Sequence, residues 1–541
     1  MRFSSLHVAA LGLGFAASAA AQDSTFEPPD FNVTLALIDQ GVNVSALPEL
    51  DSLTKRSSFS ACSIACDTLR ILFGSSNVIE QGNQGYTAFT NAYWSVQQEN
   101  VDPYCIFKPT SATQVSISIL LSRLTQCPFA AKSGGHAAFA GASNIQGGIT
   151  MSLEKLNTIK LSSDKKTADI GPGNTWFNVY TALQPADVTV IGGRVSPIGV
   201  GGLTTGGGIS FFSNIYGWAC DNVVSYEVVT ASGVIVTASA TQNKDLFFAL
   251  RGGGNNFGIV TKFTLKAIPL PGGLMWGGGR VILEDQFDAV VDAFYNVGVN
   301  SPQDPNAAQI LSFAYAQSAD LNVAAADLQY AQPVANAPIF SEYLSIPAIS
   351  DTTKVRTLAD LTQEFNASNP DGLRETYWAA TYKLNKNHTA SVRDIFFEEL
   401  DSIKDAAGLV PAATLQVITE GQLAAMTQNG GNPLGLSASA GPFLLLNMNM
   451  MWTNAADDTR ILQANKRIID RTVALAQSMG LYEDYIYMNY ASQFQDVIAS
   501  YGSTNKAMLK STAAKYDPTG VFQTLQPGYF KLNGPPSPSG P

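Results

Sequence analysis

The sequence predicts a fold of the α+β class, built in two parts. Its 541 residues exceed what one hydrophobic core usually serves, so two intertwined parts are expected. Only 14% of the residues are charged, 45% are hydrophobic and 46 are glycine, which is too apolar for a disordered chain and too rich in glycine for a helical bundle. The first half shows short β-rich runs between glycine turns, and the second half alternates amphipathic helices with apolar strands.

The first half opens with a βαβ-like pattern. Residues 104–109 predict a strand, residues 111–126 a helix that begins at Thr110–Ser111, and residues 128–134 a return strand. A further helix is expected over 174–184. The other elements are short strands between glycine turns, at 147–153, 166–173, 223–239 and 258–270.

The second half follows a glycine-rich junction at residues 269–279. Amphipathic helices are expected at 285–298 and 352–365, and apolar strands at 308–317 and 443–452. This alternation predicts an antiparallel sheet that is covered by helices.

The N-terminus has the pattern of a secretory signal peptide. Arg2 precedes an apolar run and small residues follow up to Ala21, so residues 1–21 are expected to be removed. The run is shorter than the roughly 20 residues that a membrane span needs. Glycosylation sequons agree with export, at Asn32, Asn43, Asn366 and Asn387. We therefore expect a soluble, monomeric glycoprotein that is secreted or resides in the lumen of the secretory pathway.

The net charge excludes one class of partner. The chain carries 32 basic and 43 acidic residues, so its formal charge is −11 with neutral histidines. Nucleic acids and anionic membranes bind basic surfaces. We therefore expect neither nucleic acid nor a membrane as a partner. We expect a small-molecule substrate.

Five cysteines constrain the N-terminal part. Cys62 and Cys66 are four residues apart in a stretch with helical periodicity, so they share a face and are not expected to bridge each other. Each can instead pair with Cys105 or Cys127. Both pairings stay open, with at least one bridge to Cys105 expected. Cys220 has small and apolar neighbours and is expected to be a buried free thiol.

Three histidines limit the mechanism. His7 falls in the signal peptide, and His388 falls in a sequon and is expected on a glycosylated loop. Only His136 is placed for chemistry. No GxSxG motif and no paired Cys/His spacing occur, so neither a serine hydrolase nor a metal site is expected.

Three glycine clusters predict an extended ligand that carries phosphates. They span residues 132–136, 197–210 and 251–260. Glycine is needed where backbone N–H groups approach an anion closely or where φ is positive. A Rossmann site does not fit, because no long helix and no acidic residue about 20 positions on follow Val200–Gly202.

The ordered combination of motifs resembles the berberine bridge enzyme-like flavoproteins of the vanillyl-alcohol oxidase/PCMH superfamily. The amino-acid sequence around the SGGH motif is most similar to that of the fungal members. The motifs are SGGH with Gly141, GVGGLTTGGGIS, RGGGNNFGIV, YMNY and KYDPTGVFQ. The resemblance, which covers about residues 104–532, implies a PCMH-type FAD-binding domain of two α/β subdomains (101–271), a substrate-binding domain with an antiparallel sheet covered by helices (272–479) and a C-terminal segment that returns to the FAD domain (480–533). An N-terminal arm (22–100) precedes these parts, and the Pro/Gly/Ser-rich tail (534–541) is expected to be disordered.

The resemblance also implies FAD joined covalently to His136, the histidine of SGGH. Relatives with a second link carry a cysteine where this chain has Val195, so a single link is expected. Leu203 stands where relatives often carry a histidine. Ile198 stands where relatives carry an apolar residue beside the ring, and its bulk could hinder oxygen, so oxidase and dehydrogenase both stay open, with reoxidation by molecular oxygen expected.

Backbone amides of residues 133–135 and 201–207 are expected to donate to the pyrophosphate. The residues expected to bind FAD are Lys132, Ser133, Gly134, Gly135, His136, Pro197, Ile198, Gly201, Gly202, Thr204, Thr205, Gly206, Gly207, Gly258, Ile259, Val260 and Asn489.

Catalysis needs a base that takes a substrate proton while hydride leaves for the flavin. Because His136 is used by the link, a tyrosine or a carboxylate must serve. Strand alternation over 485–490 predicts Tyr485, Tyr487 and Asn489 on one side and Tyr490 on the other. The resemblance implies that Asn489 touches FAD and that Tyr490 or Tyr487 is the base or a substrate clamp; aromatic packing at a domain seam is the alternative.

A tyrosine with an ordinary pKa of about 10 works as a base only beside cationic or donor groups. The sequence does not identify that group.

The substrate is expected between the flavin and the sheet of the second part. Alternation puts Asn447, Asn449 and Met451 on one face, which is either a pocket or a solvent face. Further candidates for the lining are Gln416, Tyr377 and Trp378. We expect a secreted FAD-dependent enzyme that oxidises an alcohol or an activated C–H group of a secondary metabolite. An oligosaccharide oxidase and a non-catalytic flavin-fold binding protein are the alternatives.

Overall fold

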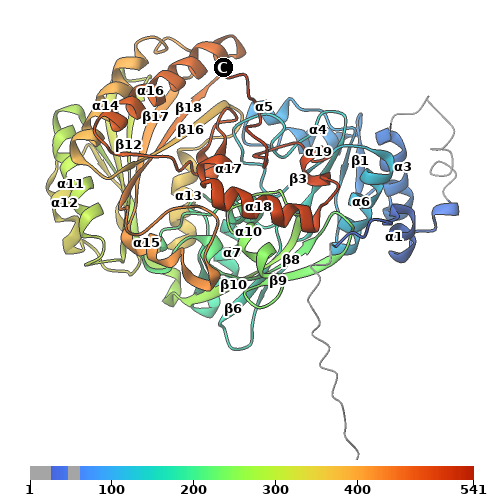
Figure 1. Ribbon diagram of the computed structural model, residues 1–541. Coiled ribbons are helices and arrows are strands. Elements are labelled where there is room, and N and C mark those ends of the chain that lie inside the picture. The colour runs from blue at the N-terminus through green and yellow to red at the C-terminus, as the bar shows by residue number, and fades with distance from the viewer. Residues whose placement is uncertain (1–25, 47–60) are drawn as a thin grey trace, which may run out of the picture.

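Three β-sheets organise the chain, as seen in a computed structural model that describes residues 26–46 and 61–541 (Figure 1). The signal peptide predicted at 1–21 lies outside the described residues. In the part that is described, no helix has the length and apolar character needed to cross a membrane.

The first sheet has four strands in the order β1-β2-β4-β3. Strands β2, β4 and β3 run parallel and β1 is antiparallel. Helix α6 (Ala112–Thr125) joins β2 to β3, and the hydroxyl of Ser111 caps it by accepting from the amide of Gln114 at 3.3 Å. The βαβ prediction is therefore confirmed. The strands are β1 (Val78–Glu80), β2 (Cys105–Phe107), β3 (Phe129–Lys132) and β4 (Ile149–Ser152).

The second sheet has six antiparallel strands around β10. Helix α7 (Trp176–Leu183) joins β6 to β7 within this sheet; it lies where the sequence predicted a helix, and Thr175 caps it. The strands are β5 (Ile159–Leu161), β6 (Thr167–Ile170), β7 (Val188–Val190), β8 (Val223–Val229), β9 (Ile235–Ser239) and β10 (Ile259–Pro269).

The third sheet has nine antiparallel strands in the order β14-β11-β13-β12-β17-β18-β16-β19, with β15 also on β11. Helices α11 (Phe287–Asn300), α14 (Lys386–Leu400) and α16 (Asp458–Ser478) cover one face and bury the second core there (Figure 1). The strands are β11 (Leu274–Leu283), β12 (Ala307–Ala316), β13 (Leu321–Tyr330), β14 (Ser350–Asp351), β15 (Lys354–Thr357), β16 (Arg374–Lys383), β17 (Val410–Ile418), β18 (Phe443–Trp452) and β19 (Tyr482–Glu483).

The C-terminal segment packs on the first half. Helix α18 (Ser503–Tyr516) lies on α10 (Lys244–Leu250), where Lys515 and Tyr516 each contact the carboxylate of Asp245 at 2.8 Å (Figure 1). Beyond it, the amide of Ser537 donates to the carbonyl of Gln493.

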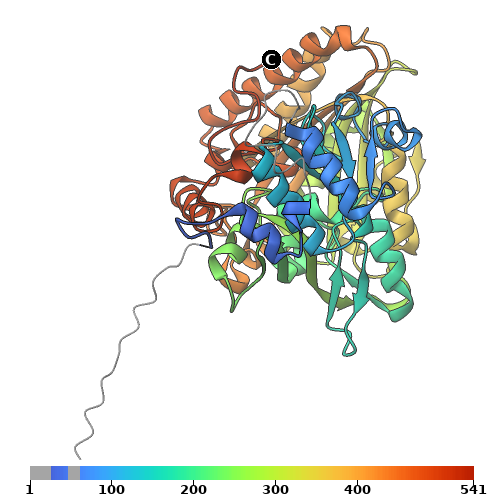
Figure 2. The same ribbon diagram turned by 90° about the vertical axis from the view of Figure 1, so that its right-hand side faces the viewer.

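Two disulfides tie the N-terminal arm to the first sheet. They join Cys62 to Cys127 and Cys66 to Cys105, while Cys220 is a buried free thiol. The predicted partner set is confirmed. Helices α1 (Val33–Asp39) and α3 (Ala61–Phe73), which carries two of these cysteines, both pack on α6 (Figure 2).

The predicted junction at 269–279 contains the change of sheet, because β10 ends at Pro269 and β11 begins at Leu274. Two other sequence-based expectations were wrong in detail. The helix predicted over 352–365, α13 (Leu358–Ala367), begins only at Leu358, after the Thr357 cap, because the residues before it form β15, whose β-branched residues pair with β11. His388 does not lie on a loop: it is a fully buried residue of α14, with Nε2 3.1 Å from the carbonyl of Thr472.

Candidate active site

A cavity of about 690 Å³ lies between the glycine loops of the first half, the uncovered face of the third sheet and residues 487–491 of the C-terminal segment. Its size is in the range of ligand sites. Fourteen of the residues predicted for the site line it: Ser133, Gly134, Gly135, His136, Ile198, Gly201, Gly202, Thr205, Gly258, Ile259, Val260, Tyr487, Asn489 and Tyr490.

His136 lies in the loop that follows β3. Its ring stacks on Trp94, with ring centroids 4.2 Å apart and an interplanar angle of 12°. Burial lowers its pKa to about 4, so the imidazole is neutral at physiological pH. Its buried Nε2 has no hydrogen-bond partner within the described chain. The site therefore holds a neutral, oriented histidine with an unused ring nitrogen.

The first two glycine loops touch each other beside this histidine. A Cβ on Gly134 would lie 2.4 Å from the amide nitrogen of Gly199, and one on Gly199 would lie 2.2 Å from that of Gly134. The hydroxyl of Ser133 links the loops, because it accepts from the amide of Gly201 at 3.0 Å and donates to the carbonyl of Pro172 at 2.6 Å. Glycine is required here because the two backbones are in contact.

Some residues predicted to bind the cofactor do not reach the cavity. The ammonium of Lys132 lies over the rings of Tyr93 and Phe89 and donates to the carbonyl of Ala92 at 3.3 Å. Burial lowers its pKa to about 8. The others that do not line the cavity are Pro197, Thr204, Gly206 and Gly207.

The amides expected to hold the pyrophosphate are partly used within the protein. The amide of Gly201 donates to Ser133, that of Gly206 to the carbonyl of Gly202, and that of Gly207 to the carbonyl of Thr204. These donors belong to the short helix α8 (Val200–Thr205) and the turn that ends it. Donation to the pyrophosphate from the remaining amides of residues 133–135 and 202–205 stays a prediction.

Residues 485–490 are not a strand. After β19 the chain is irregular and then forms a 3₁₀ turn at Met488–Tyr490, because the C-terminal segment is held by the glycine loop instead of a neighbouring strand. The phenolic oxygen of Tyr487 accepts from the amides of Gly208 and Ile209 at 3.1 and 3.2 Å. The side-chain amide of Asn489 donates to the carbonyl of Leu203 at 3.1 Å.

Arg194 supplies the cation that the sequence did not identify. Its Nη2 donates to the phenolic oxygen of Tyr490 at 2.6 Å, and Nε2 of Gln416 donates to the same oxygen at 3.1 Å. The available signal was a lone arginine in the otherwise uncharged stretch that leads to the GVGG turn. Tyr490 thus carries two donors on its oxygen.

The uncovered face of the third sheet is polar where it lines the cavity. Gln416, Asn447, Asn449 and Tyr377 all line it, so the pocket alternative for β18 holds. Trp378 does not; it points to the opposite face and is buried in the second core. Across neighbouring strands, the hydroxyls of Ser312 and Thr414 form a hydrogen bond of 2.9 Å, and the hydroxyl of Thr414 donates to the side-chain oxygen of Asn449 at 3.0 Å.

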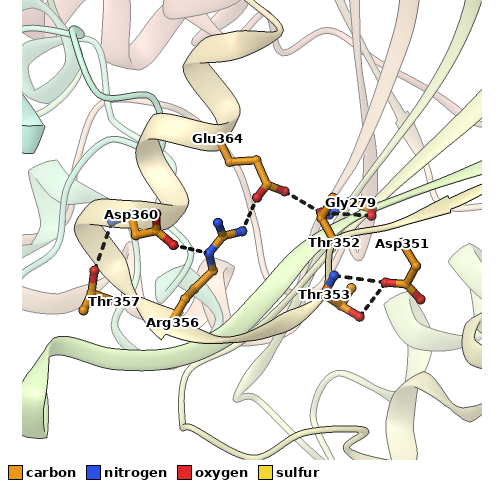
Figure 3. A network of polar contacts seen from close by, with 8 residues as sticks. All are labelled: Gly279, Asp351, Thr352, Thr353, Arg356, Thr357, Asp360 and Glu364. Atoms are coloured by element: carbon orange, nitrogen blue, oxygen red, sulfur yellow. Dashed lines mark hydrogen bonds and ion pairs between the residues drawn. The ribbon is translucent and has the colours of Figure 1, made fainter.

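The cavity also has an acidic side that sequence reasoning missed. Glu364 of α13 is held by the guanidinium of Arg356 and by the hydroxyl of Thr352, which donates to it at 2.6 Å (Figure 3). Asp327 of β13 lines the same side. Burial, and then the nearby Glu364, raise the pKa of Asp327 to about 7. No local motif marks either residue.

Comparisons with known proteins agree with this geometry. Residues 103–239 match the model of the FAD binding domain family. The chain is 36% identical over 493 residues to the "FAD-dependent monooxygenase tpcD" of Cochliobolus heterostrophus, covering 87% of this chain and 94% of that protein.

Two solved structures share the fold. The berberine bridge enzyme of Eschscholzia californica superposes with a TM-score of 0.69 at 17% identity, covering 84% of this chain and 97% of that one. 6-Hydroxy-D-nicotine oxidase of Arthrobacter nicotinovorans superposes with a TM-score of 0.68 at 19% identity, covering 82% and 96%.

The cavity suits FAD by its own chemistry. The unpaired ring nitrogen of His136 and the side-chain-free glycine backbone on the cavity wall fit a flavin dinucleotide. With the relatives above, the chain belongs to the family of FAD-dependent oxidoreductases that includes the tpcD monooxygenase, and it has the fold of berberine bridge enzyme.

Proposed function

We propose that this enzyme oxidises an alcohol or an activated C–H group of a small organic substrate, with Tyr490 as the base and with FAD joined to His136. The observation that carries the proposal is the pair of donors on the phenolic oxygen of Tyr490, from Arg194 at 2.6 Å and from Gln416 at 3.1 Å. Both donors hold this oxygen at the cavity, where it is placed to accept a proton from a bound substrate.

Tyr490 is a better base than Tyr487. The phenolic oxygen of Tyr487 already accepts from two backbone amides and from Asn489 at 3.0 Å. Burial raises the pKa of Tyr487, with Tyr490 as a further cause, so this phenol keeps its proton. Its role in the proposal is to hold the C-terminal segment on the glycine loop.

His136 is the attachment point in this proposal. Its neutral ring is stacked on Trp94 and its buried Nε2 has no hydrogen-bond partner in the described chain, which supports a link to this ring; Val195, in place of the cysteine of a second link, supports a single one. Bound FAD supplies the acceptor for the hydride. In the oxidation of an alcohol, Tyr490 takes the hydroxyl proton as hydride leaves the carbon, and a carbonyl product results.

We further propose that the enzyme is exported and that molecular oxygen restores the flavin. Disulfides persist in oxidising compartments, and this chain has two of them. Ile198 lines the cavity and is the residue whose size would tune the access of oxygen.

A substrate rich in hydroxyl groups is the second candidate. The joined side chains of Ser312, Thr414 and Asn449 form a polar row on the cavity floor, which favours an oligosaccharide. Apolar residues of the same cavity, such as Phe365 and Met451, favour a less polar metabolite instead.

The test compares two phenylalanine variants of the holoenzyme. A panel of aromatic alcohols and oligosaccharides is first screened for one compound that bleaches the flavin without oxygen. With that compound Tyr490→Phe should reduce its flavin ~100- to 10,000-fold more slowly than wild type. Tyr487→Phe should keep most of the rate. Equal, wild-type rates in both variants would exclude Tyr490 and Tyr487 as the base. The absorbance of acid-denatured protein reports whether the flavin is covalent.

A further inference from the structure

The glycine run of β11 shapes one side of the cavity. Gly279 pairs with Asp327 of β13, and a Cβ on Gly279 would lie 2.9 Å from Oδ1 of Asp327. Gly278 has a φ of +152°, and a Cβ there would strike the backbone of Thr352 at 2.7 Å. The missing side chains therefore leave room for the Asp327 carboxylate and for the turn that carries Thr352.

Asp327 and Glu364 are the two carboxylates that line the cavity in the described chain. Glu364 is satisfied by Arg356 and Thr352, a network drawn in Figure 3. No protein donor among the described residues reaches Asp327 within hydrogen-bond distance. Arg194 is the nearby cation that acts on it electrostatically, but its guanidinium binds Tyr490.

A carboxylate in this position needs a donor. Asp327 is partly buried beside the cavity, and a carboxylate withdrawn from bulk water without a partner is unfavourable, which is why its pKa rises. Two further acceptors on the same sheet face are also unpaired: the side-chain oxygens of Asn447 and Gln416, residues that are 5% and 4% exposed and line the cavity. Acceptor oxygens that have no donor call for a ligand that donates hydrogen bonds.

The register of the strands relates the position of Asp327 to that of the proposed base, Tyr490, beside which the substrate would react. Asp327 pairs with Ile310 of β12, and Leu311 pairs with Leu415 of β17, so Asp327 and Gln416 lie on one line across the sheet with β12 between them. Two steps between neighbouring strands correspond to about 10 Å. Gln416 donates to Tyr490, so the proposed base stands at the other end of this line.

We propose that Asp327 binds a hydrogen-bond donor of the substrate, an ammonium or a hydroxyl group, at the end remote from the carbon that is oxidised. The inference rests on the proposed function for the location of the reacting end. It defines the substrate class as an elongated molecule with a donor group at each end. Gly279 is a positioning residue, because it leaves space for the carboxylate.

The test uses three matched biphenyl-4-methanols that carry 4′-aminomethyl, 4′-hydroxymethyl or 4′-methyl groups. They share the alcohol to be oxidised and differ only at the remote end. Their Kd values are read from the flavin absorbance of the holoenzyme without oxygen, which shifts on binding even when no reduction follows. Failure of the 4′-methyl compound to reduce the flavin would count against the oxidation and leave the comparison of Kd values intact.

In wild type at least one of the two donor compounds should bind about tenfold tighter than the 4′-methyl compound, as expected for a hydrogen bond to a charged group. Asp327→Ala should abolish this ratio and leave the 4′-methyl Kd unchanged. Asp327→Asn, which keeps the shape and is the safer variant for folding, should retain a preference for hydroxyl and lose one for ammonium.

The control is Asp351→Asn. Asp351 lies on β14, which pairs with β11, and does not itself line the cavity. It binds Thr353 (Figure 3) and Arg280, and Arg280 is also held by the carbonyls of Tyr343 and Ile346, so this variant should keep the wild-type ratio. Equal binding of the three compounds by wild type, or a ratio that survives in Asp327→Ala, overturns the proposal.

Discussion

Glu375 of β16 is a buried acid whose replacement should stabilise the protein at alkaline pH. The residue is 2% exposed, and neither carboxylate oxygen has a hydrogen-bond partner in the described part of the chain. Its backbone is held on both sides by the side-chain amide of Gln97, at 2.9 and 3.0 Å. Burial, and then the nearby Asp371, raise the pKa of Glu375 to about 10.

The size of the effect follows from the difference between the folded and the unfolded pKa. The ordinary pKa of glutamate is 4.5. Between pH 4.5 and about pH 10 the folded state therefore keeps a proton on Glu375 that the unfolded state has lost. The free energy of unfolding then falls as pH rises, by about 1.4 kcal/mol per pH unit. Glutamine resembles the protonated acid and does not titrate. From pH 5 to pH 8 Glu375→Gln should therefore gain up to about 4 kcal/mol relative to wild type.

The assay is denaturant unfolding of both proteins at pH 5, 6.5 and 8. The two curves should lie close together at pH 5 and separate as pH rises, with the variant more stable. Glu420→Gln is the matched control, because Glu420 is exposed and should show no such trend. A stability difference between wild type and Glu375→Gln that stays constant over this pH range would refute the reasoning.

Two other predictions concern the arm and the access of oxygen. Cys105→Ser removes a bridge that spans 39 residues, so the free energy of unfolding should fall by about 4 kcal/mol, with a lower Tm, whereas Cys220→Ser should have a far smaller effect. An unchanged Tm in Cys105→Ser would count against the bridge. Ile198→Val enlarges the cavity by one methylene and should speed the reoxidation of reduced flavin by oxygen, measured by stopped flow; a slower rate would show that Ile198 does not restrict oxygen.

The elements that were predicted correctly are those with local signals. Helix α6 has a serine cap and a periodic apolar face, and its flanking strands are short apolar runs. The glycine loops were recognised because close backbone contact admits no other residue, as at Gly134. The cysteine partners followed from the helical spacing of Cys62 and Cys66.

The residues that were missed depend on contacts that are distant in the sequence. Arg194 and Tyr490 are 296 positions apart, and no periodicity relates them. Asp327 faces a cavity only because Gly279, on a different strand, has no side chain. Lys132 was assigned to the cofactor by its place in the motif, but alternation along β3 directs it to the aromatic rings behind the loop.

The same few contacts hold both the cofactor loop and the proposed base. Asn489 packs closely against Gly206: a Cβ on Gly206 would lie 2.1 Å from the side-chain oxygen of Asn489. The side-chain amide of Asn489 also donates to the carbonyl of Leu203 in the same loop. Tyr487 adds two bonds to the amides that follow. Because Tyr490 is the next residue along this 3₁₀ turn, its distance from the loop is set by these contacts. A change that loosens the loop must therefore displace the base as well, so flavin binding and proton removal are mechanically coupled in this fold.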